Sequence, residues 1–511
     1  MNKILLFLLL SLVIFGESCK KDKSSGPTPS TASTLDLVRD SVFLYAKEDY
    51  YWYDALPTYS AFNPRSFTAT ADIDALTKEV DAISQYKINP ATNLPYEYYS
   101  PSPGEAKYSF IDEGEVSTKL NAVTGDFGFA PAYLYNSLAD LRVKYVYPGS
   151  PADLAGIKRG YRITAINGQT DLTYDGATTS TNVNFIINAY NNSSNITMTL
   201  LKPDGTSFNV SLTTAIYTIN PVITSKVIDL GNGKKVGYMV FNSFVTLKNA
   251  QPQIDAAFSS FKTAGITDLV VDLRYDGGGY VETAEYLDNQ IAPSTTNNAL
   301  MYSAYYNNTL TAGNAVLLKN QVRKDDNGKS YNYSQVDFSV VGNQTKFGTS
   351  HPLNLSRVFF IVTGSTASAS ELTINNLRPY MNVQLVGRTT YGKPVGFFDI
   401  DINKYKLYIP EFETKNSAGQ GGYYAGMVPA SADYPGYNAP DDLSKEFGDV
   451  TEGLLASVLS DVKSGTYKVS AESVQSLNAK TTLSVDQQNA LAIKMDNDKF
   501  KGMLYKTPKH K

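Results

Sequence analysis

Histidine and cysteine are scarce in this sequence, which has two histidines and one cysteine among its 511 residues. His351 and His510 lie too far apart along the chain for the His-Glu-x-x-His pattern of a helical zinc site. Cys19 has no second cysteine with which to form an intrachain disulfide. We therefore predict that the protein has no metal centre and that its chemistry uses no thiolate.

Motifs for nucleotide and nucleic-acid binding are also missing. The sequence has neither a Walker-type phosphate loop nor a Gly-x-Ser-x-Gly elbow, and Gly277–Gly279 lacks the spacing of a dinucleotide-binding loop. The formal net charge is −4, whereas a nucleic-acid-binding domain normally presents a basic surface. We expect neither a cofactor nor a nucleic-acid partner.

The N-terminus has the pattern of an export signal. A lysine at position 3 precedes an apolar run over residues 4–15, which is too short to cross a bilayer comfortably. Residues 1–18 followed by Cys19 resemble a bacterial lipoprotein signal peptide and its lipidated cysteine. The resemblance implies a lipid-anchored protein of the cell envelope, in the outer membrane or the periplasm. Secretion with an incidental cysteine is the alternative.

Composition divides the rest of the chain into five further segments. Residues 19–34 are rich in Ser, Thr and Pro, which predicts a flexible tether. From 35 to 123, apolar residues recur at helical spacing, which predicts a helical N-terminal domain. Residues 466–511 are polar and end in a basic run, which predicts a C-terminal tail. The two larger segments between them are 124–215 and 216–465.

Residues 124–215 have the pattern of a small β-rich domain. Gly149-Ser150-Pro151-Ala152 precedes a short predicted helix, and Gly160 to Gly168 forms a predicted strand closed by an Asn-Gly turn. This order resembles a PDZ domain. Such a domain binds an extended peptide by adding it to a sheet edge, often with the terminal carboxylate held by backbone N–H groups. A β-rich domain without a peptide groove is the alternative.

Residues 216–465 alternate predicted strands with predicted helices. This alternation predicts an α/β layer architecture, in which continuous apolar runs form the buried strands. The predicted strands cover residues 236–241, 268–273, 358–362 and 383–386, and the predicted helices cover residues 254–261, 371–377 and 443–462.

A cluster of hydroxyl residues follows the predicted strand 358–362. Residues 363–371 (TGSTASASE) lie between this strand and a predicted helix. A serine at this turn, such as Ser368, would lie beside free N–H groups and the positive end of the helix dipole. Those donors can stabilise the oxyanion that forms when a carbonyl is attacked. Helix capping by Ser368 or Ser370 is the structural alternative.

Two glycine-containing loops follow two further predicted strands. Gly277–Gly279 could bring the backbone close to a substrate and expose its N–H groups, or it could form a plain turn. Lys393 lies between Gly392 and Pro394 in a run with little charge. Burial in such a loop would lower the pKa of the lysine, so that its amine could accept a proton from a serine. An ordinary surface charge is the alternative.

Together these motifs resemble the C-terminal processing peptidases, also called tail-specific proteases. The resemblance covers the helical segment, the PDZ domain and the motifs "DLRYDGGG", "STASASE" and "TTYGKPVG". It implies a crotonase-like and ClpP-like α/β peptidase core. It further implies that Ser368 is the nucleophile, that Lys393 is the general base, and that the backbone of Gly278 and Ala369 supplies the oxyanion donors. The implied protein is an envelope serine endopeptidase that recognises the C-terminal tails of polypeptides through its PDZ domain.

One residue departs from the family pattern. The family commonly carries a glutamine four residues after the lysine, where it helps to orient the amine, and this sequence has Phe397 there. A catalytically impaired, peptide-binding lipoprotein on the same scaffold is therefore an alternative function. A glycan-binding lipoprotein is a third, because the chain has 37 tyrosines, but no carboxylate pair for glycoside hydrolysis stands out.

The export signal predicts a modified N-terminus. We expect the mature protein to begin at an acylated Cys19, which mass spectrometry of the native N-terminal peptide would detect. In a Cys19→Ser variant the acyl group has no attachment site, so the protein should leave the membrane fraction. A wild-type protein that starts at another residue, without acylation, would contradict this prediction.

Overall fold

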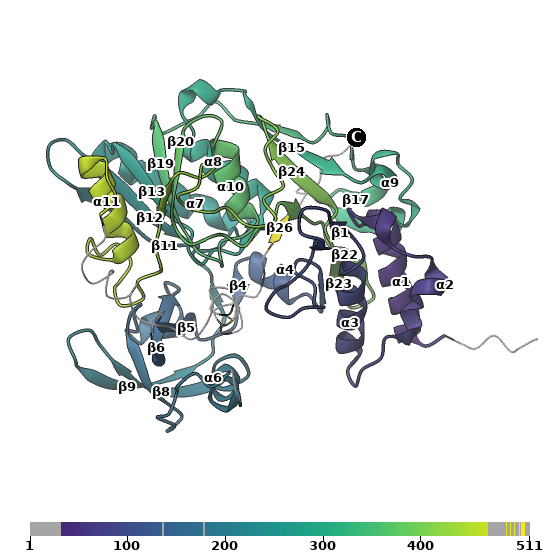
Figure 1. Cartoon of the computed structure of the whole chain (residues 1–511), viewed down its shortest axis with the longest axis horizontal. Coiled ribbons are helices and arrows are strands. Elements are labelled where there is room, and N and C mark those ends of the chain that lie inside the picture. The colour runs from purple at the N-terminus through teal and green to yellow at the C-terminus, as the bar shows by residue number, and fades with distance from the viewer. Residues whose placement is uncertain are drawn as a thin grey trace, which may run out of the picture.

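The computed structural model describes residues 32–134, 137–176, 179–325, 327–468, 487, 491, 495, 500 and 502–505. The predicted signal peptide, Cys19 and most of the predicted tether lie outside these residues. Figure 1 shows a large α/β unit with a smaller β-rich unit beside it. Within the described ranges, no helix combines the length and the apolar character that crossing a bilayer requires.

The N-terminal segment is built around two helices, α1 (Thr34–Asp49) and α3 (Asp72–Ser84). A capping box starts α1, because Ser33 and Asp36 each accept a hydrogen bond from the backbone N–H of the other. The buried side chains of this segment belong to the same hydrophobic cluster as those of the large α/β unit, so the two share one core. Its shorter elements are α2 (Tyr59–Phe62), α4 (Glu115–Leu120), β1 (Ile88–Asn89), β2 (Leu94–Pro95), β3 (Phe110–Asp112) and β4 (Val123–Thr124).

The β-rich unit is a five-stranded antiparallel sheet with a hydrophobic cluster of its own. Asn167 and Gly168 both have positive φ, as the predicted Asn-Gly turn requires. In sheet order the strands are β5 (Phe129–Leu134), β6 (Ser137–Val146), β7 (Arg162–Ile166), β8 (Asn195–Leu201) and β9 (Ser207–Thr213), and the helices are α5 (Pro151–Leu154) and α6 (Thr181–Asn191).

The large unit contains a six-stranded sheet that is parallel except for one edge strand. Its central strands are buried along almost their whole length, because helices cover both faces (Figure 1). In sheet order the strands are β11 (Val222–Asp229), β12 (Lys235–Phe241), β13 (Asp268–Asp272), β19 (Arg357–Val362), β20 (Asn382–Gly387) and β25 (Gly436–Asn438). The main helices are α7 (Leu247–Ala264), α8 (Val281–Ile291), α10 (Ala369–Leu377) and α11 (Gly453–Ser464).

Three sequence motifs follow three neighbouring strands of this sheet. β13, β19 and β20 are parallel neighbours, so their carboxyl ends lie at the same edge. The chain leaves β13 toward Gly277–Gly279, leaves β19 toward Ser368 and leaves β20 toward Lys393. This edge is the usual ligand-binding edge of an open parallel sheet. The topology therefore brings the three motifs together.

A second layer joins the N-terminal segment to the large unit. β3 pairs with β23 (Tyr405–Tyr408), which in turn pairs with β22 (Ile400–Ile402). A neighbouring four-stranded sheet has the order β18 (Gln344–Lys346), β15 (Leu300–Tyr306), β24 (Phe412–Asn416) and β21 (Val395–Gly396). Shorter elements of the unit are α9 (Asn308–Thr311), β10 (Tyr217–Thr218), β16 (Val322–Lys324) and β17 (Ser330–Asn332).

Residues near the C-terminus are part of the core. β26 (Gly502–Leu504) pairs in parallel with β14 (Gly278–Tyr280), which includes part of the glycine motif. Leu491 and Met495 are buried in the hydrophobic cluster of the β-rich unit. The sequence predicted only a polar tail beyond residue 465, whereas Leu491, Met495, Met503 and Leu504 are apolar residues of that stretch and are buried.

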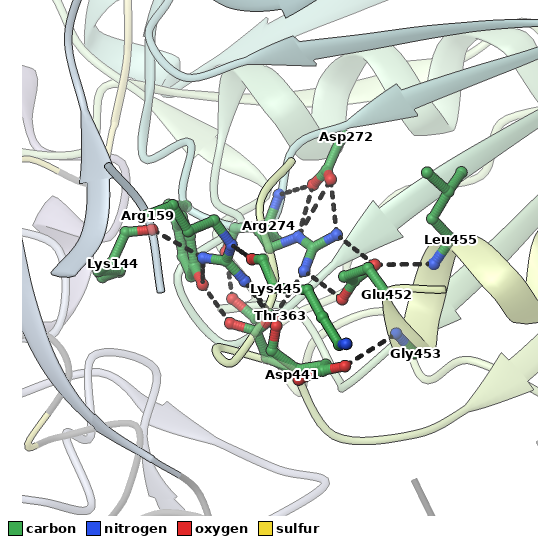
Figure 2. A network of polar contacts seen from close by, with 12 residues as sticks. Lys144, Arg159, Asp272, Arg274, Thr363, Asp441, Lys445, Glu452, Gly453 and Leu455 are labelled. Carbon is green, nitrogen blue, oxygen red and sulfur yellow. Dashed lines mark hydrogen bonds and ion pairs between the residues drawn. The ribbon is translucent and has the colours of Figure 1, made fainter. Parts of the chain in front are cut away.

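A buried ion network connects the β-rich unit to the large sheet (Figure 2). The Arg274 guanidinium is fully enclosed and pairs with Asp272 at 2.7 Å, Asp441 at 2.5 Å and Glu452 at 2.9 Å. Arg159, from the loop before β7, also reaches Asp441 at 2.9 Å. Burial alone would raise the pKa of Asp441, but the two guanidinium groups outweigh it and lower that pKa to about 2. Asp441 therefore stays ionised at neutral pH.

Removing the Arg274 charge should destabilise the protein strongly. An Arg274→Met substitution leaves buried carboxylates without a counter-charge, which typically costs about 3–5 kcal/mol of the free energy of unfolding. The matched control is Lys404→Met, because Lys404 pairs with Glu113 at the surface, where such pairs contribute little. Denaturant unfolding of both variants tests the expectation, and equal midpoints would contradict it.

Candidate active site

Ser368 lies at a strained turn between β19 and α10. It is the residue before the first residue of the helix, and its backbone has φ 58° and ψ −104°. Positive φ is unfavourable for a serine and is typical of residues held in place at functional sites. The side chain is fully buried at the capping box that starts α10, and its hydroxyl donates no hydrogen bond to another described residue. An unpaired buried hydroxyl is costly in a structural position and is useful in a nucleophile.

The neighbouring hydroxyls are engaged in structural contacts. The Thr366 hydroxyl donates to the Leu273 carbonyl at 2.7 Å. The Ser370 hydroxyl donates to the Asp276 carbonyl at 3.2 Å. These bonds fasten the serine segment to the loop that follows β13. Ser368 therefore differs from both neighbours in having its hydroxyl unpaired.

The glycine loop packs against the N-terminus of α10. Gly278 has φ 101°, and a Cβ added there would lie 3.0 Å from both the Ala367 carbonyl oxygen and the Ala369 nitrogen. Only glycine allows this approach without a shift of the backbone. The structure thus brings the two predicted oxyanion residues, Gly278 and Ala369, into contact. The N–H of Gly278 donates to the Asp276 carboxylate at 2.7 Å.

Lys393 is fully buried between two aromatic rings. Its Nζ lies 3.6 Å from the centre of the Phe397 ring and 5.4 Å from that of Tyr108. It also donates a hydrogen bond of 3.4 Å to the Tyr108 carbonyl. Burial lowers the pKa of Lys393 well below its usual value, although the carboxylates of Glu97 and Glu371 favour the charged form. The predicted surface alternative for this lysine is therefore wrong.

One buried carboxylate connects the serine turn to the lysine loop. A single oxygen of Glu371, Oε2, accepts hydrogen bonds of 2.8 Å from the backbone N–H groups of both Ser368 and Lys393. The other oxygen accepts from the Gly392 N–H at 2.7 Å and from the Thr390 hydroxyl. Burial raises the pKa of Glu371. The sequence did not assign a role to Glu371, but a Ser-x-x-Glu spacing at a helix start was the available signal.

The N-terminal segment forms one wall of the lysine pocket. Glu97 is buried and accepts hydrogen bonds from the Tyr50 hydroxyl and from the backbone N–H groups of Tyr108 and Ser109. The Tyr108 hydroxyl donates to the Gly392 carbonyl at 2.6 Å. No motif in this segment pointed to the site. The contribution of the N-terminal segment to the lysine pocket follows only from the way this segment packs onto the second layer.

Phe397 occupies the position where the family commonly has glutamine. Its ring covers the Lys393 amine, and its backbone bonds to the C-terminal strand. An aromatic face attracts a charged amine by about 0.5–2 kcal/mol, but it offers the neutral amine no hydrogen-bond acceptor like that of glutamine. The Tyr108 carbonyl supplies that acceptor. Phe397 and Tyr108 thus orient Lys393 together.

His351 does not contribute to this arrangement. The His351 ring is hydrogen-bonded to the carbonyls of Asn289 and Gly348, which belong to none of the three motifs. His510 lies outside the described residues. Within the part of the chain that the structure describes, no group of three His, Cys, Asp or Glu side chains could hold a metal ion.

A pocket of about 630 Å³ opens beside the glycine loop. Gly277 and Gly278 line it together with Asn191 and Asn192, which lie at the end of α6. The pocket therefore lies between the β-rich unit and the serine turn. Its other lining residues are Glu115, Val116, Lys119, Leu120, Ser243 and Phe500.

Two family models match the chain. Residues 235–420 match peptidase family S41, and residues 142–180 match the PDZ domain. The first match contains Ser368, Lys393 and the glycine loop. The second lies within the β-rich unit, which confirms the predicted PDZ domain.

A curated relative and two solved structures are similar to the chain. A carboxyl-terminal-processing protease of Picosynechococcus sp. is 26% identical over 259 residues, which are 50% of this chain and 50% of the relative. The chain thus matches about half the length of that relative. An S41 protease structure from Bacteroides fragilis is 22% identical, with a TM-score of 0.52 over 83% of this chain and 97% of that one. The photosystem II D1 C-terminal processing protease is 16% identical, with a TM-score of 0.43 over 80% and 95% of the two chains.

The family matches and the likeness in fold agree with the topology. The Bacteroides fragilis structure shares the α/β peptidase fold predicted from the sequence. The order of the PDZ unit and the S41 match along the chain is also the order predicted. Residues 235–420 thus have the features of peptidase family S41 and the chain carries a PDZ domain, which supports the resemblance to the C-terminal processing peptidases.

Proposed function

We propose that this protein is a serine endopeptidase that cleaves polypeptides with Ser368 as nucleophile and Lys393 as general base. The observation that carries the proposal is the shared bond to Glu371. One carboxylate oxygen holds the backbone of both residues at 2.8 Å, and the lysine amine is fully buried. The arrangement fixes the backbone of a buried serine to that of a lysine whose pKa is lowered by burial, and a serine nucleophile without histidine requires such a pair.

The reaction follows from these groups. As the Ser368 oxygen attacks the substrate carbonyl carbon, its proton passes to the neutral amine of Lys393. The oxyanion that forms is stabilised by the free N–H of Ala369 at the start of α10 and by an N–H of the glycine loop. Gly278 would have to exchange its bond to Asp276 for this purpose. The protonated lysine then returns the proton to the leaving amine.

Water completes the cycle. The acyl group remains on the Ser368 oxygen after the amine product has left. Lys393, now neutral again, takes a proton from water, and the hydroxide attacks the acyl carbon. Collapse of the second oxyanion releases the carboxylate product, while the proton goes back from the lysine to the serine oxygen. No cofactor is needed at any step.

Substrate recognition and location follow from the PDZ unit and the signal. PDZ domains bind extended peptides by strand addition, so we propose that substrates are captured by their C-terminal tails. The carboxyl-terminal-processing name of the cyanobacterial relative supports the same choice. The signal and Cys19 support lipid anchoring in the cell envelope, in the outer membrane or the periplasm.

A peptide-binding protein with impaired catalysis is the second candidate. Phe397 favours it, because the aromatic ring replaces a residue that orients the base in related enzymes. In that case the PDZ unit would retain tails without cleaving them. The two candidates differ in a single measurable quantity, the rate at which an unfolded polypeptide is hydrolysed.

Ser368→Ala should lower kcat/KM for an unfolded protein by at least about 10³-fold, as the loss of such nucleophiles usually does. Ser365→Ala is the matched control, because Ser365 lies on the same segment but its backbone N–H only bonds to Thr363. The control should keep most of the activity. Rates are followed by appearance of new peptide termini in mass spectrometry. Hydrolysis by Ser368→Ala at the wild-type rate would refute the assignment of Ser368 as nucleophile. If neither the wild-type protein nor any variant hydrolyses the substrate, the second candidate is favoured.

A further inference from the structure

The C-terminal strand β26 lies on the glycine loop of the proposed active site. Its Gly502 N–H donates to the Gly277 carbonyl at 3.0 Å, and Gly502 is in parallel register with Gly278. Strand addition to an open backbone edge is the way in which proteases and PDZ domains commonly hold an extended peptide. β26 therefore has the position of an added strand.

The other edge of the same strand is bonded to the segment that follows Lys393. The Phe397 N–H donates to the Met503 carbonyl at 2.9 Å, and the Tyr505 N–H donates to the Phe397 carbonyl at 3.1 Å. β26 thus fills the space between the loop expected to supply an oxyanion donor and the loop that carries the general base. Met503 is fully buried there.

The Gly502 carbonyl lies against the glycine loop. A Cβ on Gly278 would lie 2.3 Å from this oxygen and 3.0 Å from the Ala369 nitrogen. β26 therefore covers the backbone that is expected to supply the oxyanion donors. Ser368, the residue before Ala369, is fully buried in the presence of this strand.

We propose that Phe500 and Gly502–Tyr505 form an internal ligand that occupies the substrate position of the active site and displays the side-chain pattern that the site accepts. The inference rests on the proposed function, since it identifies the substrate class of that site. Every polypeptide substrate must first displace this strand. β26 therefore occupies the active site until a competing polypeptide binds there.

The pattern begins with a residue that has no side chain. A Cβ on Gly502 would lie 2.7 Å from the Phe397 ring and 2.5 Å from the Phe500 ring, so a larger residue cannot enter without moving them. The next two residues, Met503 and Leu504, are apolar and buried. The site thus selects chains with glycine at the residue that pairs with Gly278, followed by two apolar residues.

The neighbouring pocket gives a competing chain its approach. Phe500 lines the pocket of about 630 Å³ together with Gly277 and Gly278, so a chain that enters the pocket contacts Phe500. Leu491 and Met495 are buried in the hydrophobic cluster of the PDZ unit. The same part of the chain therefore contacts both the peptide-binding unit and the proposed catalytic loops, as a captured tail would.

A Gly502→Val substitution tests the proposal, because the valine side chain should expel the strand without altering a catalytic residue. Gly348→Val is the matched control, since Gly348 is exposed and a Cβ there makes only ordinary contacts. The probe is a fluorescent peptide with the sequence of residues 500–505. Binding is measured on the full chain carrying Ser368→Ala, so that the result does not depend on hydrolysis.

We expect Gly502→Val to bind the probe at least about tenfold more tightly than the control, because apparent affinity rises as the occupied fraction of the site falls. A peptide with valine in place of its glycine should bind at least about tenfold more weakly. Equal affinity of Gly502→Val and the control, or equal affinity for the two peptides, would overturn the proposal.

A second measurement covers the case in which Gly502→Val does not fold. In the full chain carrying only Ser368→Ala, hydrogen exchange at Gly502 and Tyr505 should be slow, because both N–H groups are bonded. Excess probe peptide should accelerate it by displacing the strand. Exchange that stays slow at saturating peptide would show that β26 is a fixed part of the fold. A protein without protease activity could still show this displacement of β26. The experiment therefore distinguishes a failure of the internal-ligand proposal from a failure of the proposed protease function.

Discussion

The bonds to the buried Glu371 carboxylate are the interaction on which the proposed active site depends. Glu371 is in the first turn of α10, and it accepts hydrogen bonds from the backbone of Ser368, Gly392 and Lys393. A serine turn and a lysine loop that follow different strands are thereby fixed to one side chain. Each of these N–H groups is buried, and leaving one unpaired would cost about 1–3 kcal/mol. One side chain holds both loops, so the two loops cannot move independently. The distance between the proposed nucleophile and the proposed base is therefore nearly fixed.

Burial and charge act in opposite directions on the lysine. Enclosure by Phe397 and Tyr108 favours the neutral amine, whereas the carboxylates of Glu97 and Glu371 favour the ammonium form. Burial also raises the pKa of both carboxyl groups and so favours their neutral, protonated forms. A protonated carboxyl group stabilises the ammonium form of Lys393 less than a carboxylate does. The balance lowers the pKa of Lys393, and the same enclosure excludes the water that would stabilise its charge. The lowered pKa thus favours the neutral amine that the proposed base requires.

The sequence was enough to predict the α/β layers, because buried parallel strands appear as apolar runs, and the resemblance to the C-terminal processing peptidases implied that the three motifs meet. It could not predict contacts that depend on how distant segments pack. The lysine pocket includes Tyr108 of the N-terminal segment, which sequence spacing marked only as part of a helical domain. A predicted helix over 443–462 begins only at Gly453, because the buried Glu452 caps it and pairs with Arg274. Residues 502–504 were too short an apolar run to stand out in a polar tail, yet they pair with the glycine loop.

The central claim is that a neutral Lys393 activates Ser368, and the pH dependence of serine labelling tests it most directly. The rate at which an organophosphonate modifies Ser368 in the full chain can be followed by intact mass, with the modified residue identified by peptide mapping. The reactive form contains the deprotonated amine, so the rate should rise with pH and level off well below about 10.4, the pKa of a free lysine. Lys393→Met should remove both the rise and most of the rate. A rate that still climbs above pH 10, or labelling that is unchanged in Lys393→Met, would contradict the account.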